Sequence, residues 1–236
     1  MKKKLFGLIL ILLITPEFFA AQDSTGFSSK YFFFPGKQNN WEGKFYSGLS
    51  LAQLPTKIVE DVFDQVPTLE LKYITGILPN LSLKGELNTN VITNQLVISP
   101  DYNFSINKFS FAVGNDLTFW YGFFKSDGFD VSVVGWGYSP FITAGFNADD
   151  FFLSMKIAAD VRAQNTFMKS LRYKDSSPKF VGFTMTIAIE QPLWGNNYMA
   201  LGFRAYYTKF FYKSWLSFST FDQYLYYPEF FAGFVF

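Results

Sequence analysis

Fifteen charged side chains of this 236-residue chain recur at alternate positions of otherwise apolar stretches. Alternate residues of a β-strand point to the same side, so we expect these charges to share one face of several strands. Seven are basic and eight are acidic, which favours a network of salt bridges over a site of one sign. The fifteen are Lys44, Glu70, Lys72, Lys84, Glu86, Asp101, Lys108, Asp116, Asp130, Lys156, Asp160, Arg162, Glu190, Arg204 and Glu229.

Two carboxylate pairs, Glu70 with Glu86 and Asp116 with Asp130, have the residue type that acid–base catalysis requires. Carboxylates that alternate with lysines are more often structural. The chain contains no His and no Cys. This composition excludes Ser-His-Asp catalysis, thiol nucleophiles, disulfides and zinc–thiolate sites. We therefore predict a protein that is not an enzyme, with no catalytic residues, no metal and no cofactor.

The overall composition narrows the class of protein further. Twenty basic and 19 acidic residues give a formal net charge of +1, which argues against nucleic-acid binding because that function needs a basic surface. Hydrophobic residues make up 49% of the chain and charged residues 17%, so the chain is expected to fold.

The elements that must position the charges are β-strands, because apolar and polar residues alternate with period two. In residues 95–106, for example, Leu96, Ile98 and Tyr102 share one face, and Asp101 and Asn103 share the other. The same pattern predicts about ten strands, at residues 44–52, 68–77, 80–88, 94–106, 108–121, 128–144, 150–163, 178–191, 197–210 and 227–236.

Two all-β architectures have strands with one apolar and one polar face: a soluble β-sandwich and a transmembrane β-barrel. The predicted strands reach ten to 13 residues and more, long enough to cross a bilayer obliquely, whereas sandwich strands average about five or six. Aromatic clusters, such as Phe119 to Tyr121, occur near strand ends and fit the membrane interface. We predict an antiparallel up-and-down barrel of about ten strands. The pattern is compatible with eight to twelve strands. Residues 31–34 or 214–225 could supply an additional pair.

The last residues support the same interpretation. Phe230, Ala232, Phe234 and Phe236 lie on one face of the final predicted strand. This ending resembles the C-terminal signal of Gram-negative outer-membrane β-barrel proteins. The resemblance implies an outer-membrane location, contact with membrane lipid, and recognition of Phe230, Phe234 and Phe236 by the barrel assembly machinery. The known barrel enzymes of that membrane use an active-site His, so the resemblance carries over none of their activities.

The N-terminus has the features of an export signal. Lys2 to Lys4 precede an apolar run from Leu5 to Ile14, and Ala20 and Ala21 offer a cleavage site. The predicted organisation is therefore a signal peptide at residues 1–21, an N-terminal periplasmic segment at 22–43 and the barrel at 44–236. Short connections alternate with long ones at 53–67, 164–177 and 211–226. That order predicts that both termini are periplasmic.

One segment departs from the strand pattern. In residues 56–66, Ile58, Val59, Val62, Phe63 and Val66 follow helical spacing, which predicts a short amphipathic helix. We expect it to pack on the barrel rim. A lid or a partner-docking element is the alternative.

The predicted lumen-lining charges are Glu70, Lys72, Lys84, Glu86, Asp101, Asp116, Lys156, Asp160, Arg162, Glu190 and Arg204. A barrel of about ten strands is close to the size that its own side chains fill, so we expect a closed or narrow, charge-paired lumen. Three functions agree with this picture: a passive small-solute channel, a structural or surface anchor, and a subunit of an envelope secretion or assembly complex. A secreted sugar-binding sandwich and an enzyme that uses lumen carboxylates are weaker alternatives. The oligomeric state is not predicted.

Overall fold

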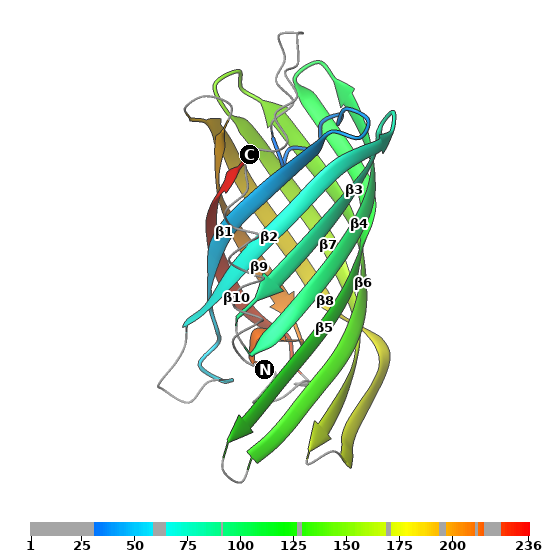
Figure 1. The fold of residues 1–236 in the computed structure, drawn as a ribbon, viewed down its shortest axis with the longest axis vertical. Helices are drawn as coiled ribbons and strands as arrows, with labels where there is room; N and C mark the ends of the chain where they lie inside the picture. The colour runs from blue at the N-terminus through cyan, green and yellow to red at the C-terminus, as the bar shows by residue number, and fades with distance from the viewer. Residues whose placement is uncertain are drawn as a thin grey trace, which may run out of the picture.

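The computed structural model describes residues 31–58, 65–90, 92–126, 129–168, 171–193, 197–210, 212–214 and 223–236. Within them, ten strands form a closed antiparallel barrel, which confirms the predicted fold class (Figure 1). The strands are β1 (Gly43–Gln53), β2 (Gln65–Leu78), β3 (Leu81–Thr89), β4 (Thr93–Ile106), β5 (Phe109–Ser126), β6 (Phe129–Asn147), β7 (Phe152–Met168), β8 (Leu171–Pro192), β9 (Tyr198–Thr208) and β10 (Leu225–Val235).

The barrel closes between its first and last strands. β1 pairs with β10 from Tyr46 opposite Val235 to Ala52 opposite Glu229. Phe45 and Phe236 extend this seam, since the N–H of each donates to the carbonyl of the other, at 3.2 and 2.8 Å. Each strand therefore has a neighbour on both sides, and this pairing satisfies backbone hydrogen bonds that a bilayer cannot satisfy.

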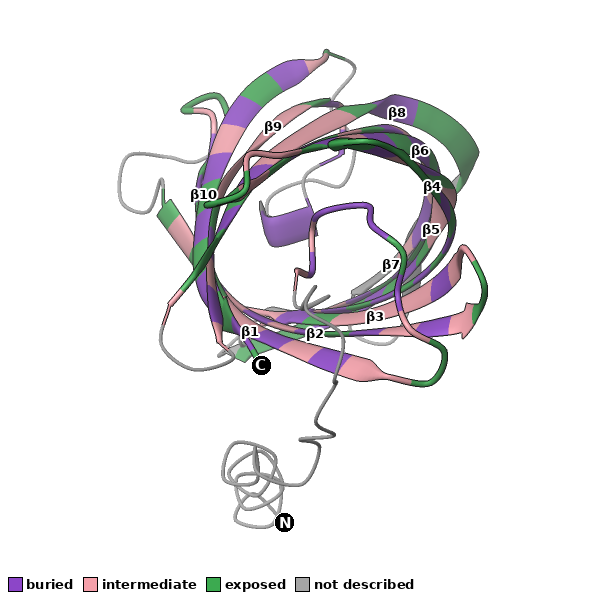
Figure 2. Ribbon diagram, turned by 90° about the horizontal axis from the view of Figure 1, so that it is seen from above, coloured by how far each residue is buried: buried purple, intermediate pink, exposed green. Residues whose placement is uncertain are grey.

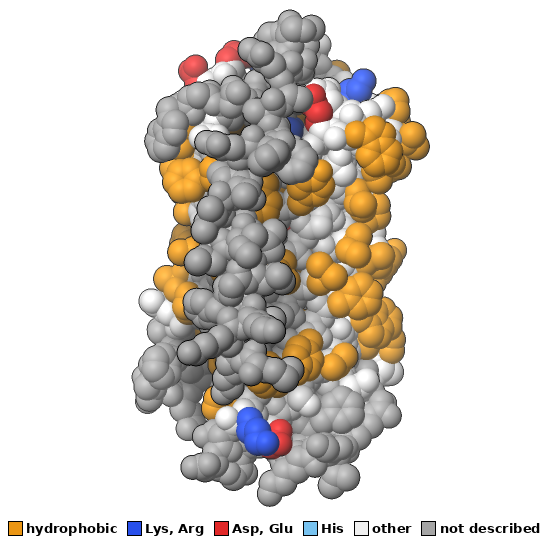
Figure 3. Space-filling view, viewed as in Figure 1, with side chains coloured by type: hydrophobic (Ala, Val, Ile, Leu, Met, Phe, Trp, Pro, Cys, Tyr) orange, Lys and Arg blue, Asp and Glu red, His pale blue; other side chains and the backbone are white. Residues whose placement is uncertain are grey.

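The two faces of the barrel differ in polarity as the alternation predicted. On β4, the side chains of Ser99 and Asp101 are each 1% exposed, whereas those of Leu96 and Tyr102 are 46% and 49% exposed. Apolar side chains cover the middle of the visible outer face, and the charged side chains lie towards its two ends (Figure 3). This is the surface of a transmembrane barrel.

Tight turns define one end of the barrel, which we call the short-turn end. Asn80, Asn107 and Asp149 adopt positive φ values of 70°, 55° and 68° in the turns that precede β3, β5 and β7. Asn and Asp tolerate this left-handed conformation better than other residues with side chains. Phe236 lies at the same end, beside Phe45. We call the opposite end the long-loop end.

Four strands extend further than the others at the long-loop end. β5 to β8 have 17 to 22 residues each, whereas β2 has 14 and β3 has nine. The prediction of a long loop at 164–177 was therefore wrong, because β7 and β8 continue through most of it (Figure 1). β9 pairs with β8 only from Gly182 onwards. Pro178 thus lies on a free edge, where a missing N–H is tolerated.

The backbone is regular at Pro140, because β6 keeps one register with both neighbours on either side of it. The register shifts between β7 and β8, next to Gly182. Gly182 has a φ of 148°, and a Cβ there would lie 2.1 Å from the carbonyl oxygen of Tyr207. This position therefore requires glycine.

The predicted helix at 56–66 is not present where the chain is described. Residues 56–58 form a turn, and Gln65 and Val66 already belong to β2. Residues 59–64 lie outside the described residues, as do residues 1–30 with the predicted signal peptide. No helix among the described segments is long and apolar enough to cross a membrane.

Two segments lie inside the ring of strands (Figure 2). One is the stretch from Tyr31 to Gln38, which we call the N-terminal plug; it is not the additional strand that its sequence allows. The other follows β9 and includes the short 3-10 helix η2 (Tyr212–Ser214). We call its residues Phe210, Tyr212 and Lys213 the loop plug.

Candidate functional site

The barrel encloses a chamber of about 160 Å³ between the two plugs. Phe32 and Phe33 of the N-terminal plug line it towards the short-turn end, and the three residues of the loop plug line it towards the long-loop end. Nine of the eleven predicted lumen charges also line it: Glu70, Lys72, Lys84, Glu86, Asp116, Lys156, Asp160, Arg162 and Arg204. Asp101 and Glu190 are buried beside it, at 1% and 0% exposure.

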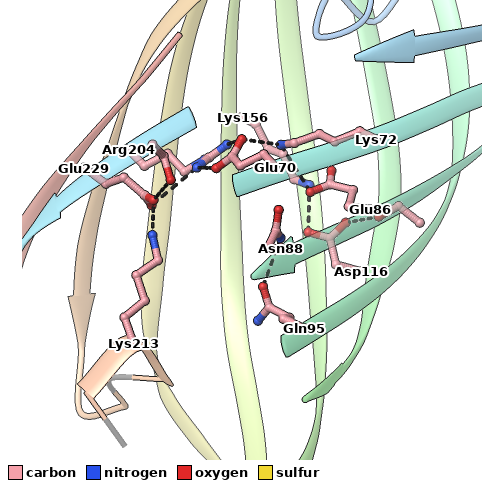
Figure 4. Close-up of polar contacts among 12 residues, drawn as sticks. Glu70, Lys72, Glu86, Asn88, Gln95, Asp116, Lys156, Arg204, Lys213 and Glu229 are labelled. Carbon is pink, nitrogen blue, oxygen red and sulfur yellow. Dashed lines mark hydrogen bonds and ion pairs between the residues drawn. The ribbon is translucent and has the colours of Figure 1, made fainter. Parts of the chain in front are cut away.

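Four of these charges form a continuous chain of ion pairs together with Glu229 and Lys213 (Figure 4). In order, they are Lys213, Glu229, Arg204, Glu70, Lys72 and Glu86. Cations and anions alternate, so each inner member has a neighbour of opposite sign on both sides. The chain has no net charge, which lowers the cost of holding it away from bulk water.

Arg204 on β9 is the centre of this chain. Its guanidinium contacts Glu70 of β2 through both terminal nitrogens, with Nη2 at 2.9 Å from Oε2. Its Nη1 also lies 3.3 Å from Oε2 of Glu229 on β10. Because β2 and β9 are separated by β1 and β10, this contact links walls of the barrel that are not hydrogen-bonded to each other. A planar guanidinium suits such two-pronged contacts better than an ammonium group.

Lys72 continues the chain along β2. Its ammonium lies 3.2 Å from a carboxylate oxygen of Glu70 and 3.2 Å from one of Glu86 on β3. The candidate catalytic pair Glu70 and Glu86 therefore shares a cation. Both carboxylates are thus ion-pair partners of one buried ammonium group.

Asp116 on β5 and Lys156 on β7 form a second ion pair, at 2.7 Å. Ser99 donates to the other carboxylate oxygen of Asp116 at 2.6 Å. The Lys156 ammonium also lies 3.8 Å from the centre of the Phe141 ring, a cation–π contact.

The remaining predicted charges form two local clusters. Lys84 on β3 pairs with Asp101 on β4 at 2.8 Å. Asp160 on β7 accepts hydrogen bonds from Arg162 at 2.9 Å, Ser139 at 2.6 Å and Thr184 at 2.7 Å. Both carboxylates thus have a cation and at least one neutral donor, which is the arrangement that buried charges need.

Glu190 differs from the other lumen carboxylates in its partners. Its oxygens accept hydrogen bonds from the backbone N–H groups of Phe32 at 2.5 Å, Phe33 at 3.0 Å and Phe34 at 2.8 Å. Three consecutive amides of the N-terminal plug therefore converge on one carboxylate. The sequence pattern placed Glu190 on the inner face but gave no indication of this partner.

The loop plug contains a cation that the sequence analysis missed. The Lys213 ammonium donates to Glu229, and both side chains are almost fully buried. Burial lowers the pKa of Lys213, and the Glu229 carboxylate acts in the opposite direction. Lys213 lies outside the alternating strands, so the periodicity that identified the other charges does not include it. Next to it, the ring of Phe210 packs on that of Trp120 at 4.8 Å.

Four charges of the wider predicted set remain. Lys44 and Glu229 are buried, at 7% and 0% exposure, and Glu229 lines the chamber. Lys108 and Asp130 do not line the chamber, and this part of the prediction was wrong. Lys108 pairs with Asp149 in the turns, where the side chains are 54% and 71% exposed. The Asp130 side chain is 47% exposed, near the tip of the β5–β6 hairpin. Alternation alone does not show where a strand leaves the membrane.

The predicted assembly-signal residues lie on the outer surface. Phe230, Phe234 and Phe236 are 62%, 43% and 47% exposed, at the β10 side of the seam. The described residues contain no group of three or more acidic side chains arranged to hold a metal ion. What the interior offers chemically is a set of neutralised ion pairs around a small polar space.

No protein-family model and no curated protein sequence matches the chain. Solved structures do match. Neisserial surface protein A is 15% identical, with a TM-score of 0.39 over 82% of this chain and 95% of its own. A loop L8 deletion mutant of OmpT from Vibrio cholerae is 7% identical, with a TM-score of 0.20 over 82% and 97%. Outer-membrane expressed OmpT of Vibrio cholerae is 10% identical, with a TM-score of 0.19 over 85% and 99%.

Proposed function

We propose that the protein is a small outer-membrane β-barrel that is closed by its own chain and acts as a membrane-embedded anchor, not as an open pore or an enzyme. The observation that carries this proposal is that segments from both ends of the barrel line the same 160 Å³ chamber. The apolar outer surface and the C-terminal resemblance support the location.

The interior supports a closed lumen on energetic grounds. A chamber of this size has room for several water molecules, and it is lined by Phe32 and Phe33 on one side and by the three residues of the loop plug on the other. A passing ion would have to separate buried pairs such as Arg204 with Glu70, which costs several kcal/mol per unpaired charge. The neutralised carboxylates also support the absence of acid–base catalysis.

The test is to reconstitute the purified full chain in planar bilayers and record current. A folded barrel, verified by a heat-dependent shift on a denaturing gel, is expected to give no single-channel steps. Discrete steps from the folded protein would support the small-solute channel instead.

We further propose that residues 1–21 direct export, that both termini are periplasmic, and that the assembly machinery recognises the β10 end. Substituting Phe236→Ala is expected to lower the amount of assembled barrel in the outer-membrane fraction. Leu201→Ala, on the apolar outer surface of β9 and 45% exposed, lies outside the predicted signal and is the control, which should have a smaller effect. Equal assembly of the Phe236 variant and the wild type would contradict the recognition.

A second candidate, a docking platform for an envelope partner, is favoured by the extension of β5 to β8 beyond the other strands. Copurification from gently solubilised membranes tests it. A stoichiometric partner that is lost when the tip residues 124–131 are replaced by a short turn would support it, and recovery of the barrel alone would oppose it.

A further inference from the structure

The short-turn end of the lumen is built as a binding site for an extended aromatic peptide, and the N-terminal plug occupies it. We propose that residues 31–38 are a displaceable intramolecular ligand of this site, that Glu190 is the group that holds them, and that their release exposes the chamber to small polar solutes from the short-turn end. The inference rests on the proposed closed barrel.

The first observation is the set of hydrogen bonds to Glu190. This carboxylate is 0% exposed, and its hydrogen bonds within the described chain come from the amides of Phe32, Phe33 and Phe34. The plug thus supplies the donors that allow a carboxylate to be buried here. Three amides that converge on one anion also fix the position of the plug backbone.

The second observation is a cation contact on the other side of the plug. Lys44 on β1 donates to the side-chain oxygen of Gln38 and to the carbonyl of Tyr31, at 3.3 Å for the latter. The Tyr31 hydroxyl in turn donates to the carbonyl of Lys37 at 2.9 Å, which draws the ends of the plug together. The barrel wall therefore binds the plug by an anion at one place and a cation at another.

The third observation is that the wall is shaped around the plug. Phe33 packs against Phe231 with ring centres 5.1 Å apart, and Phe34 against Phe152 at 4.9 Å. Opposite them, Gly145 leaves room. A Cβ at Gly145 would lie 2.6 Å from Pro35 and 2.7 Å from the Phe34 ring. Small wall residues opposite large plug residues are typical of a fitted binding site.

The fourth observation is that the barrel does not need the plug for its hydrogen-bond ladder. Residues 31–38 pair with no strand, and the seam closes directly between β1 and β10. The nearest backbone pairing is the isolated bridge between Asn40 and Gly76. Releasing the plug therefore breaks side-chain contacts and the three bonds to Glu190, and leaves the strand pairing intact. The plug can therefore leave the lumen without unfolding the barrel.

The proposal can be tested in the full chain with one cysteine as a reporter, because the protein contains no other cysteine. Ala188 is 1% exposed, packs in the same cluster as Phe32 and lines the chamber. An Ala188→Cys variant is treated in detergent with a small water-soluble thiol reagent, and the labelling rate is compared with and without Glu190→Ala. The matched reporter is Thr118→Cys, which lines the chamber two residues from Trp120 of the loop-plug side.

We expect Glu190→Ala to increase the labelling rate at position 188 by about tenfold or more, because each hydrogen bond to a charged group contributes enough to shift an equilibrium by about that factor. Glu190→Gln, which keeps one acceptor, should give an intermediate rate. Labelling at position 118 should change less than at 188.

If the rate at position 188 is the same with and without Glu190, the proposal is wrong. An equal rise at both reporters would also overturn it, because the effect would then be general loosening. Should Glu190→Ala fail to fold, Lys44→Met provides the second release variant, with the same expected direction. If the labelling rate at position 188 does not rise and the wild type gives no current in bilayers, the plug proposal is wrong but the proposed closed barrel still holds. If the wild type conducts current, both proposals are wrong.

Discussion

The two plugs occupy opposite halves of one lumen but are held by different chemistry. The N-terminal plug offers uncharged backbone amides to Glu190. The loop plug offers an ammonium group, Lys213, to Glu229. Glu229 also contacts Arg204, and through it Glu70 and Lys72, so the loop plug is connected to the chain of ion pairs. The N-terminal plug is thus held by one carboxylate and by Lys44, and the loop plug is held by a network of ion pairs.

This difference teaches which part of the interior stabilises the barrel and which part only fills it. A buried carboxylate with neutral donors can lose its charge without leaving an opposite charge unpaired. A buried carboxylate with two cations cannot, because removing the charge of Glu229 takes an ion pair from Lys213 and leaves Arg204 with Glu70 alone. We therefore expect substitution of Glu229 to lower the free energy of unfolding more than substitution of Glu190, whose effect should be confined to the N-terminal plug.

The largest expected effect on stability comes from Glu229→Gln. The change leaves Lys213 and Arg204 with one carboxylate fewer, and we expect the free energy of unfolding to fall by about 3–5 kcal/mol. Urea titration of the detergent-folded barrel, followed by tryptophan fluorescence, measures it. A loss below about 1 kcal/mol would show that the ion-pair network does not stabilise the fold.

A smaller effect is expected from the matched change Glu190→Gln. The amide keeps one acceptor oxygen for the plug, and the hydrogen bonds that Glu190 accepts come from neutral amides, so the loss is about 1–3 kcal/mol and is confined to the plug. The same urea titration should show a much smaller change than for Glu229→Gln. If both variants lose the same stability, the comparison between the plugs fails.

The smallest expected effect is at the apolar side of the loop plug. Trp120 packs on Phe210 and donates from Nε1 to Gln164 at 3.2 Å. Trp120→Phe keeps the ring contact and removes the donor, so we expect a loss of about 1 kcal/mol. Labelling of a cysteine at position 118 should rise, and labelling at position 188 should stay unchanged. If labelling rises at position 188 and not at position 118, Trp120 does not support the loop plug as we propose.

The strands could be predicted from the sequence because the signal is local. Each strand of a barrel alternates between lipid and lumen, so residues such as Leu96 and Asp101 reveal the two faces without knowledge of any partner. The clearest exception has a structural cause. On β6, the inner residues Val131 and Val133 are apolar because they belong to the buried cluster that also contains Phe210 and Tyr212.

The pairing of charges and the plugs could not be predicted because they depend on distant segments. Glu70 and Arg204 are 134 residues apart in the sequence, and Glu190 and Phe32 are 158 apart. Only the closed register of ten strands brings them together. The plugs also lack period two, since they lie across the lumen and not along a strand. The extent of β7 and β8 was underestimated, since residues 164–177 were interpreted as a loop and the two strands continue through most of them.

The central claim is that two segments of the chain close one lumen, and single-channel recording tests it most directly. Four proteins are compared in planar bilayers: the wild type, Glu190→Ala, Lys213→Glu and the double variant. Lys213→Glu places a second anion beside Glu229 and should expel the loop plug. We predict that the first three proteins are silent and that the double variant alone gives discrete steps. Steps from the wild type, or a silent and correctly folded double variant, would contradict the account.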